Sequence, residues 1–311
     1  MNELKQISVY TILLNYKAPL DTIECINSLK AMSKENVDFN IVLIDNCSQD
    51  DSCKIFNELY QYDEHVHLIF NSENNGYAAG NNKGIKFALD HNADYIWVLN
   101  NDTIADVNCL KELLIAEKNN ICAMIGAKVC DYYNKEKVLY WNYKLDNYLR
   151  NTCSNNITID ESGYNDIKAE WLSGCSLFAK SQIFKEHLID ERYFLYGEDV
   201  AYSIELKNSK INLILSGKSL IWHKESISTN RISNLKLYYL WRNEMIVAAL
   251  YMKNPYKMLY FIKRFMILPF RLLRRYVKGI FLKEEYKDYV KYEWFAVKDF
   301  LLKKDGKFNE R

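Results

Sequence analysis

The chain contains little glycine and little proline, with ten and three residues among 311. Flexible and extended linkers are rich in these residues, so the sequence leaves little room for them. Its eight cysteines include no CxxC pair, which favours reduced thiols in structural or incidental positions. The start, MNELKQISVY, lacks the pattern of a signal peptide. We therefore expect a cytoplasmic protein.

Long apolar runs are also missing. The longest such run in the C-terminal part, residues 245–252, is far shorter than the roughly 20 apolar residues that a membrane span needs. We therefore expect a chain that is soluble or lies on a surface.

The chain has almost no net charge, because 41 basic side chains face 40 acidic ones. With 49% hydrophobic residues, this balance excludes collagens, disordered acidic tails and histone-like binders. The two ends nevertheless differ in sign. Residues 1–100 carry a balance of −7, whereas residues 231–311 carry nineteen Lys or Arg against eight acids, a balance of +11. A basic partner surface would thus be C-terminal.

Two glycine-rich nucleotide motifs are absent. No G-x-G-x-x-G follows the first predicted strand, residues 7–14, which ends in LLNYK. Backbone amides could not approach a dinucleotide there as they do in a Rossmann dehydrogenase, which argues against NAD binding. The chain also has no G-x-x-x-x-G-K-[ST] motif, which excludes the P-loop nucleotide hydrolases.

Short β-rich runs alternate with helical ones in the first third of the chain. We predict strands at residues 7–14, 41–44, 66–70 and 95–99, and helices at residues 20–32, 52–60 and 76–90. This alternation predicts a mainly parallel sheet with helices on both faces. Later segments predict a helix after Asn108, strands near residues 123–129, 172–179 and 212–217, a polar loop at residues 194–206, and helices from Leu235 onward.

Polar clusters stand where these strands end, and ligands of parallel sheets bind at that edge. The clusters are Asn15-Tyr16, residues 45–50, residues 74–82 and residues 100–102, followed later by Gly197-Glu198-Asp199 and Trp222-His223. Taken singly, each of them also fits a structural role as a helix cap, a turn or a packed residue. Their order along the chain is more specific than any one of them.

In that order, the clusters resemble the family 2 glycosyltransferases of the GT-A fold, in particular the rhamnosyltransferase-like branch that builds bacterial surface polysaccharides. The resemblance covers residues 7–245. It implies an α/β, Rossmann-like GT-A domain at residues 1–232, with a nucleotide-binding half at 1–102 and an acceptor half at 103–232. Residues 233–311 would form a basic, aromatic-rich helical C-terminal region.

The resemblance also implies a nucleotide-sugar site. An aromatic ring such as Tyr16 can stack on a pyrimidine, while Asp45 and Asn46 can hydrogen-bond a base or ribose. The small and amide side chains of residues 74–82 let a ligand approach the backbone. The expected donor-binding residues are Leu14, Asn15, Tyr16, Asp45, Asn46, Asn74, Gly76, Gly80, Asn81, Asn101, Trp171, Gly174 and Arg242.

Asn101-Asp102 stands where the family carries an acidic metal-binding element. A hard cation such as Mg²⁺ or Mn²⁺ prefers oxygen ligands and shares the charge of a diphosphate leaving group. Because the first position is Asn101, Asp102 is expected to be the main ligand. His223 is expected to complete the site, although a lone His after a strand is as often a packed structural residue.

Glu198-Asp199 matches the acidic pair of the family. In the family the second carboxylate takes the proton of the attacking hydroxyl, and attack from the face opposite the nucleotide inverts the anomeric carbon. We therefore expect Asp199 to act as the base and Glu198 to orient the site or meet the acceptor.

The expected function is a metal-dependent, inverting transfer from a nucleoside-diphosphate sugar, with dTDP-rhamnose favoured, to a lipid-linked or growing surface glycan. Open alternatives are a UDP-galactose, UDP-glucose or UDP-N-acetylhexosamine transferase, or a non-catalytic glycan-assembly subunit. Residues 253–278 hold eight cations, no acid and many apolar side chains. This composition suits an anionic membrane surface, here the inner face of the cell membrane, rather than nucleic acid. The alternative interpretation is that this basic segment packs on the core or on a second subunit of a homodimer.

Overall fold

A large mixed sheet forms the centre of the protein. The computed structural model describes residues 6–141, 143–150, 152, 157–224, 234–281 and 285–308. Within these residues the sheet has eleven strands, and its main path runs β3-β2-β1-β4-β10-β6-β11-β5. The strands β1, β2, β3 and β4 are parallel neighbours, whereas β10 runs antiparallel to both β4 and β6. The predicted α/β class is confirmed.

The first half of the sheet follows the predicted alternation closely. Its elements are β1 (Ile7–Asn15), α1 (Pro19–Ala31), β2 (Val37–Asp45), α2 (Ser52–Tyr60), β3 (Val66–Phe70), α3 (Gly76–Asp90) and β4 (Tyr95–Asn100). The strands end at Asn15, Asp45 and Asn100, so their polar residues meet at one edge of the sheet.

The second half is less regular and contains several short strands. Its elements are β5 (Thr103–Ala105), α4 (Cys109–Asn119), β6 (Ala123–Asp131), β7 (Lys137–Tyr140), β8 (Ile157–Thr158), α5 (Ile159–Ser162), β9 (Ile167–Lys168), β10 (Ser176–Lys180), α6 (Ser181–Glu186), α7 (Glu198–Asn208) and β11 (Asn212–His223).

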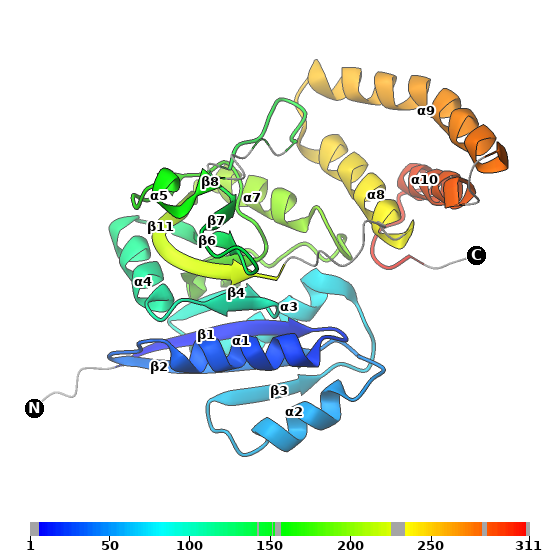
Figure 1. Ribbon diagram of the computed structural model, residues 1–311. Helices are drawn as coiled ribbons and strands as arrows, with labels where there is room; N and C mark the ends of the chain where they lie inside the picture. Colours follow the sequence, from blue (N-terminus) through cyan, green and yellow to red (C-terminus); the bar gives the residue numbers. More distant parts are fainter. Residues whose placement is uncertain are drawn as a thin grey trace, which may run out of the picture.

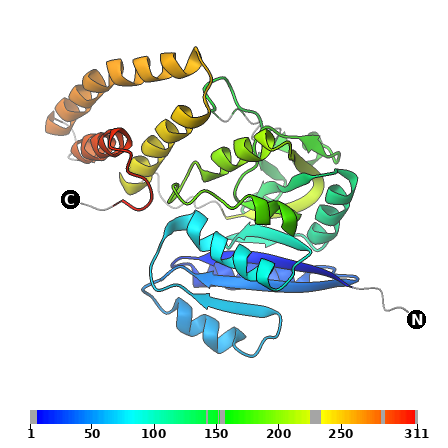
Figure 2. The same ribbon diagram turned by 180° about the vertical axis from the view of Figure 1, so that it is seen from behind.

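Alternating side chains of the central strands build two cores, one on each face of the sheet. In β1, Val9 and Leu13 pack with α1, α2 and α4, whereas Tyr10 and Ile12 pack with α3, α6 and α7. Figure 1 shows α1 in front of the sheet, and Figure 2 shows α3 on the opposite face. Because both faces are covered, the open edge at the strand ends is the place where a ligand can reach the sheet.

Three helices follow the sheet: α8 (Asn234–Tyr251), α9 (Tyr256–Phe281) and α10 (Glu285–Leu301). They extend from the sheet domain on the side of α7 (Figures 1 and 2). Tyr238 and Tyr239 of α8 pack with Phe194 and with Ala296 of α10, which joins these helices to the loop before α7. Among the described helices, none combines the length and apolar character needed to cross a bilayer. The predicted division at residue 232 stays a prediction.

Candidate active site

The polar edge of the sheet is held by a chain of buried side chains. Asn15 Nδ2 donates to Asp45 Oδ1 at 2.7 Å, and Thr22 Oγ1 donates to Asn15 Oδ1 at 2.9 Å. Asn101 Nδ2 in turn donates to Thr22 Oγ1 at 2.7 Å. Asn15 and Asp45 are fully buried, so they fix the ends of β1 and β2. The adjacent Tyr16 is 47% exposed, which leaves its ring available for stacking on a base.

A second set of hydrogen bonds holds the loop before α3. Asn46 Nδ2 donates to Asn74 Oδ1 at 3.0 Å and to the carbonyl of Gly76 at 3.1 Å. Gly76 has a φ of +90°, and a Cβ there would lie 2.2 Å from the carbonyl oxygen of Phe194. That same oxygen accepts a hydrogen bond from Tyr77 N at 2.8 Å. The loop before α7 therefore lies directly against the start of α3, and only glycine fits the contact.

Three residues that we expected to touch the donor make contacts within the fold: Gly80 packs against Leu14 of β1, and Asn81 bonds within α3. A Cβ at Gly80 would lie 2.5 Å from Leu14 Cδ1. Asn81 is 1% exposed, and its Nδ2 donates to the carbonyl of Tyr77 at 3.0 Å. We therefore assign Leu14, Gly80 and Asn81 to the support of the site rather than to direct donor contact.

The pairing of β11 with β5 brings Asp102 and His223 together. The end of β11 pairs with β5, with His223 opposite Thr103. His223 Nε2 lies 3.0 Å from Asp102 Oδ1. Their side chains are 12% and 30% exposed, so both are partly open to a ligand.

The side chains of Asp102 and His223 supply only some of the ligands that a hard divalent cation needs. Among the described residues, no group of three His, Cys, Asp or Glu side chains gathers around one point. The protein thus offers two ligands, a carboxylate oxygen and an imidazole nitrogen. The remaining ligands of a six-coordinate ion would come from a diphosphate and from water, which is common for Mg²⁺.

The acidic pair opens α7 and faces a cavity of about 330 Å³. Gly197 adopts a left-handed conformation, with φ +85°, directly before Glu198. Glu198 and Asp199 therefore occupy the first turn of the helix, where backbone N–H groups favour negative charge. The residues that line this cavity are Tyr148, Leu149, Arg150, Trp171, Tyr196, Gly197, Glu198, Asp199, Val200, Leu240, Asn243, Glu244, Val247 and Ala248.

The two carboxyl groups differ in their surroundings. Glu198 is 8% exposed, and its Oε2 has no hydrogen-bond partner among the described residues. Burial and the charge of Asp199 raise the pKa of Glu198 to about 8. Burial also raises the pKa of Asp199, but the backbone amides of Val200 and Gly174 oppose that rise by donating to its carboxylate. Near neutral pH, Asp199 is therefore the member of the pair that holds the negative charge.

Tyr77 connects the acidic pair to the polar edge, and sequence analysis did not single it out. Its hydroxyl donates to the carbonyl of Gly174 at 2.6 Å. A Cβ at Gly174 would lie 3.2 Å from Tyr77 Oη and 3.6 Å from Asp199 Cβ. Burial, and then the charges of Glu198, Asp199 and Asp102, hold the pKa of Tyr77 well above its ordinary value. The negative charges of Asp199 and of Asp102 thus both raise the pKa of the Tyr77 hydroxyl.

Comparison with known proteins identifies the family. The model of "Glycosyl transferase family 2" matches residues 8–172, which is just over half of the chain. The chain belongs to this family. A relative, the "Low-salt glycan biosynthesis hexosyltransferase Agl10" of Haloferax volcanii, is 22% identical over 249 residues, which cover 76% of this chain and 74% of that protein.

Two solved structures show the same fold. GalNAc-T7 with UDP, GalNAc and Mn²⁺ superposes with a TM-score of 0.62 at 12% identity, over 96% of this chain. This family 2 chain spans only 57% of the GalNAc-T7 chain. Staphylococcus aureus TarS 1–349 in complex with UDP-GlcNAc gives a TM-score of 0.55 at 14% identity, over 96% of this chain and 82% of that one. The expected GT-A fold is confirmed.

Two expected donor-binding residues remain. Trp171 lies beside the acidic pair, whereas Arg242 of α8 does not fit its expected role. Trp171 is 6% exposed, lines the cavity and meets the ring of Tyr143 edge-on at 4.7 Å. Arg242 was expected among the donor-binding residues. Its guanidinium is fully buried, and it donates to the carbonyl of Gly306 at 2.8 Å and to the side chain of Asn243 at 3.0 Å. We correct its role to a structural cation that joins α8 to the C-terminal loop.

Asn243 was not expected to matter on its own, and it holds the acidic pair in place. Its Nδ2 donates to the carbonyls of Leu195 and Tyr196, at 2.9 and 2.6 Å. These carbonyls lie directly before Gly197. The dipeptide Arg242-Asn243 therefore positions the entry into α7, although it belongs to the C-terminal helices.

Proposed function

We propose that this chain is an inverting glycosyltransferase that moves a hexosyl group from a nucleoside-diphosphate sugar to a hydroxyl group of a glycan or lipid-linked glycan. The observation that carries this proposal is the acidic pair Glu198-Asp199 in the lining of a cavity, near the polar edge that holds Asp102. The presence of both Asp102 and Asp199 favours an enzyme over a non-catalytic assembly subunit.

Asp199 acts as the general base in this proposal. An acceptor hydroxyl loses its proton to Asp199 while its oxygen forms a bond to the anomeric carbon. The bond from that carbon to the diphosphate oxygen breaks, and the electron pair leaves with the nucleoside diphosphate. Glu198, whose pKa lies at about 8, keeps a proton at neutral pH and can donate it in a hydrogen bond to the acceptor.

Asp102 and His223 would hold a divalent cation, Mg²⁺ or Mn²⁺. When bound, such a cation neutralises charge on the diphosphate leaving group. Tyr16 would stack on the base, and the loop at Asn74 and Gly76 would approach the donor. These roles rest on the position of each side chain at the edge of the sheet.

The donor is proposed to be a UDP-hexose or UDP-N-acetylhexosamine. The hexosyltransferase name of the Haloferax relative and the UDP and UDP-GlcNAc in the two solved structures favour it. The dTDP-rhamnose that the sequence analysis favoured gains no support from these names, and it remains a candidate to be measured beside the UDP sugars.

Calorimetric titration of the wild-type protein tests the proposed site. We expect UDP or dTDP to bind in the presence of Mn²⁺ and to bind more weakly with a chelator, because a cation held by Asp102 and His223 would offset the negative charge of the diphosphate. AMP serves as the control, since it lacks a diphosphate. Failure of both nucleoside diphosphates to bind would refute the proposal.

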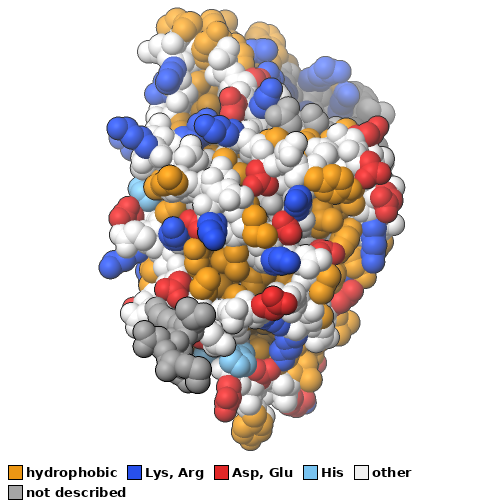
Figure 3. Space-filling model, turned by 90° about the vertical axis from the view of Figure 1, so that its left-hand side faces the viewer, with side chains coloured by type: hydrophobic (Ala, Val, Ile, Leu, Met, Phe, Trp, Pro, Cys, Tyr) orange, Lys and Arg blue, Asp and Glu red, His pale blue; other side chains and the backbone are white. Residues whose placement is uncertain are grey.

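We further propose that α9 lies on an anionic membrane. Nine large apolar side chains of this helix are between 42% and 74% exposed, and most recur at intervals of three or four residues: Met258, Leu259, Ile262, Met266, Ile267, Phe270, Leu273, Tyr276 and Val277. Figure 3 shows hydrophobic side chains at the top of the molecule, the end where α9 begins in Figure 1. Lys263 and Arg274 are exposed beside them. An apolar face flanked by cations fits the boundary of an anionic bilayer.

Two of the cations in this segment serve the fold instead. Arg271 Nη2 and Arg275 Nη1 both pair with Glu293 of α10, whose side chain is fully buried. Replacing either arginine would leave that carboxylate without one of its partners and loosen α10. A test of membrane binding should therefore change the apolar face.

Phe270→Ser is expected to lower the partition into anionic vesicles by about tenfold or more, because burying a Phe side chain contributes roughly 1.5–3 kcal/mol. Leu59→Ser is the matched control, since Leu59 is 54% exposed on α2 at the opposite end of the molecule (Figure 1). Vesicle co-sedimentation at low and high salt measures both. Equal partition of the two variants, or a salt-resistant dimer that Phe270→Ser dissociates, would contradict membrane binding by α9.

A further inference from the structure

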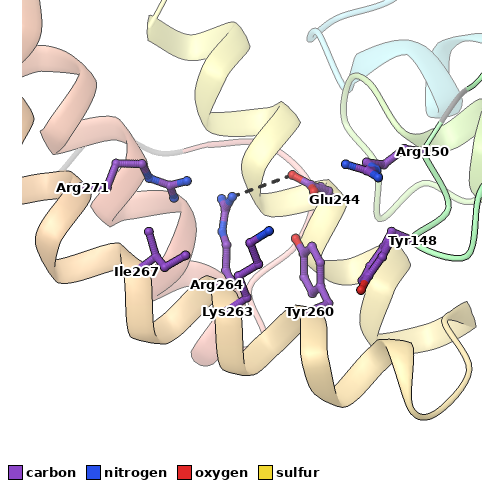
Figure 4. A pocket seen from close by; sticks show the side chains of 8 residues that line it. All are labelled: Tyr148, Arg150, Glu244, Tyr260, Lys263, Arg264, Ile267 and Arg271. Carbon is purple, nitrogen blue, oxygen red and sulfur yellow. Dashed lines mark ion pairs between the residues drawn. The ribbon is translucent and has the colours of Figure 1, made fainter.

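A second cavity, of about 370 Å³, lies beside the acidic one. It is bounded by α8, α9 and the segment at residues 148–150 (Figure 4). Its lining residues are Tyr148, Arg150, Glu244, Tyr260, Lys263, Arg264, Ile267 and Arg271. Four of these are cations and one is a carboxylate. The size falls in the range of small-molecule sites, about 300–1,000 Å³.

Arg264 has a nearly buried guanidinium group whose hydrogen-bond donors are not fully satisfied. Its side chain is only 9% exposed, and it projects from α9 into the cavity (Figure 4). The nearest carboxylate oxygen, on Glu244, lies 3.9 Å from Nη1, which is too long for a hydrogen bond. Nε and Nη2 are buried and have no hydrogen-bond partner within the described part of the chain. Such donors are costly to bury unless an acceptor meets them.

The other cations add to the same positive field. Lys263 is exposed at the cavity wall (Figure 4). Arg150 also lines the cavity, although its guanidinium pairs with Asp146 at 2.6 Å. Burial and the neighbouring Arg264 and Arg275 lower the pKa of Arg271, although Glu293 opposes this. An anion with several acceptor oxygens would satisfy the free guanidinium donors and relieve the repulsion among these cations.

The cationic cavity adjoins the cavity of the acidic pair. Tyr148, Arg150 and Glu244 line both cavities. Asp199 lines the cavity of the acidic pair, and Arg264 lines the cationic cavity. A molecule that places a sugar hydroxyl near Asp199 could therefore place an anionic group near Arg264.

We propose that the cavity around Arg264 binds the phosphate or diphosphate group of the acceptor, and so selects acceptors whose sugar is linked to a phosphate. This inference rests on the proposed function. Arg264 lies on α9, the helix that also carries the exposed apolar face. An alkyl chain attached to the phosphate could therefore pass directly to the membrane. A free phosphate or diphosphate offers the same chemistry without the chain.

The test measures anion binding without relying on turnover. Inorganic pyrophosphate is titrated into the full-length protein in a chelator, which suppresses metal-dependent binding at Asp102. We expect Arg264→Gln to weaken binding about tenfold, since a charge-assisted bidentate contact is lost. Lys263→Gln removes an exposed charge from the cavity wall and should weaken binding about threefold, on the order of one screened ionic contact. Lys253→Gln removes an exposed cation outside the lining and should leave the affinity unchanged.

A second arm separates the two sources of phosphate. Octyl diphosphate should bind wild-type protein more tightly than pyrophosphate, and Arg264→Gln should weaken both. Equal affinity for the two ligands would indicate a free-anion site and overturn the acceptor assignment. Equal pyrophosphate affinity in wild type, Arg264→Gln and Lys263→Gln would overturn the site itself. UDP binding with Mn²⁺ is measured on the same samples, so that a failed donor site is told apart from a failed anion site.

Discussion

Asp199→Asn is expected to lower the turnover number by about 10²-fold or more, because the substitution keeps the size of the side chain and removes the proton acceptor. Donor affinity should stay unchanged, since Asp199 lines the cavity and is not among the residues proposed to hold the diphosphate. Initial rates of nucleoside diphosphate release give the first quantity, and calorimetry with UDP gives the second.

Glu198→Gln is the matched comparison for Asp199→Asn, because it makes the same change from carboxyl to amide at the neighbouring residue. Because Glu198 keeps its proton below a pKa of about 8, an amide resembles its resting state at neutral pH. We expect turnover to remain within about tenfold of wild type, in contrast to the loss of a base. If Glu198→Gln were the inactive variant and Asp199→Asn the active one, the roles of the two carboxylates would have to be exchanged.

Asp102→Ala should weaken Mn²⁺-dependent donor binding by about 10-fold to 100-fold, the range seen when groups that support a metal site are lost. His223 would then be the one remaining side chain of the pair, and an imidazole carries no negative charge for a hard cation. Calorimetry with UDP, with and without Mn²⁺, measures the change. Asp160→Ala, an exposed carboxylate of α5, is the control.

The metal assignment has its own contrary result. If wild-type protein bound UDP equally well with Mn²⁺ and with a chelator, the donor site would be independent of metal. Asp102 and His223 would then form an ion pair within the fold, as their 3.0 Å contact also allows.

Much of the sheet could be predicted from the sequence, because its strands are buried on both faces and read as short apolar runs between helical ones. The helices Ser52–Tyr60 and Gly76–Asp90 and the strand Val66–Phe70 have the predicted bounds. The polar ends of β1, β2 and β4 also lie at one edge, as expected from parallel pairing.

The segments around the acidic pair were predicted less well. The polar loop expected at residues 194–206 is helical from Glu198 onward, as part of α7. The strand expected at residues 172–179 begins only at Ser176. In both places a tertiary contact decides the backbone. Asn243 holds the carbonyls before Gly197, and Tyr77 holds the carbonyl of Gly174. Partners so distant in sequence leave no local pattern.

The charges of the C-terminal helices show the same limit. The sequence groups eight cations at residues 253–278, but it does not tell which of them face solvent. The structure turns Arg271 and Arg275 toward the buried Glu293 and Arg264 into a cavity. A run of cations thus divides into a membrane-facing set, a structural pair and a candidate anion site.

The most direct measurement of the central claim is ³¹P and ¹H NMR of wild-type protein with Mn²⁺, a panel of UDP and dTDP sugars, and octyl-linked sugar acceptors with and without a diphosphate. We predict release of a nucleoside diphosphate and a product whose anomeric configuration is opposite to that of the donor, as expected for direct displacement with Asp199 as base. A product that keeps the configuration of the donor, or donors that bind and are never consumed, would contradict the account.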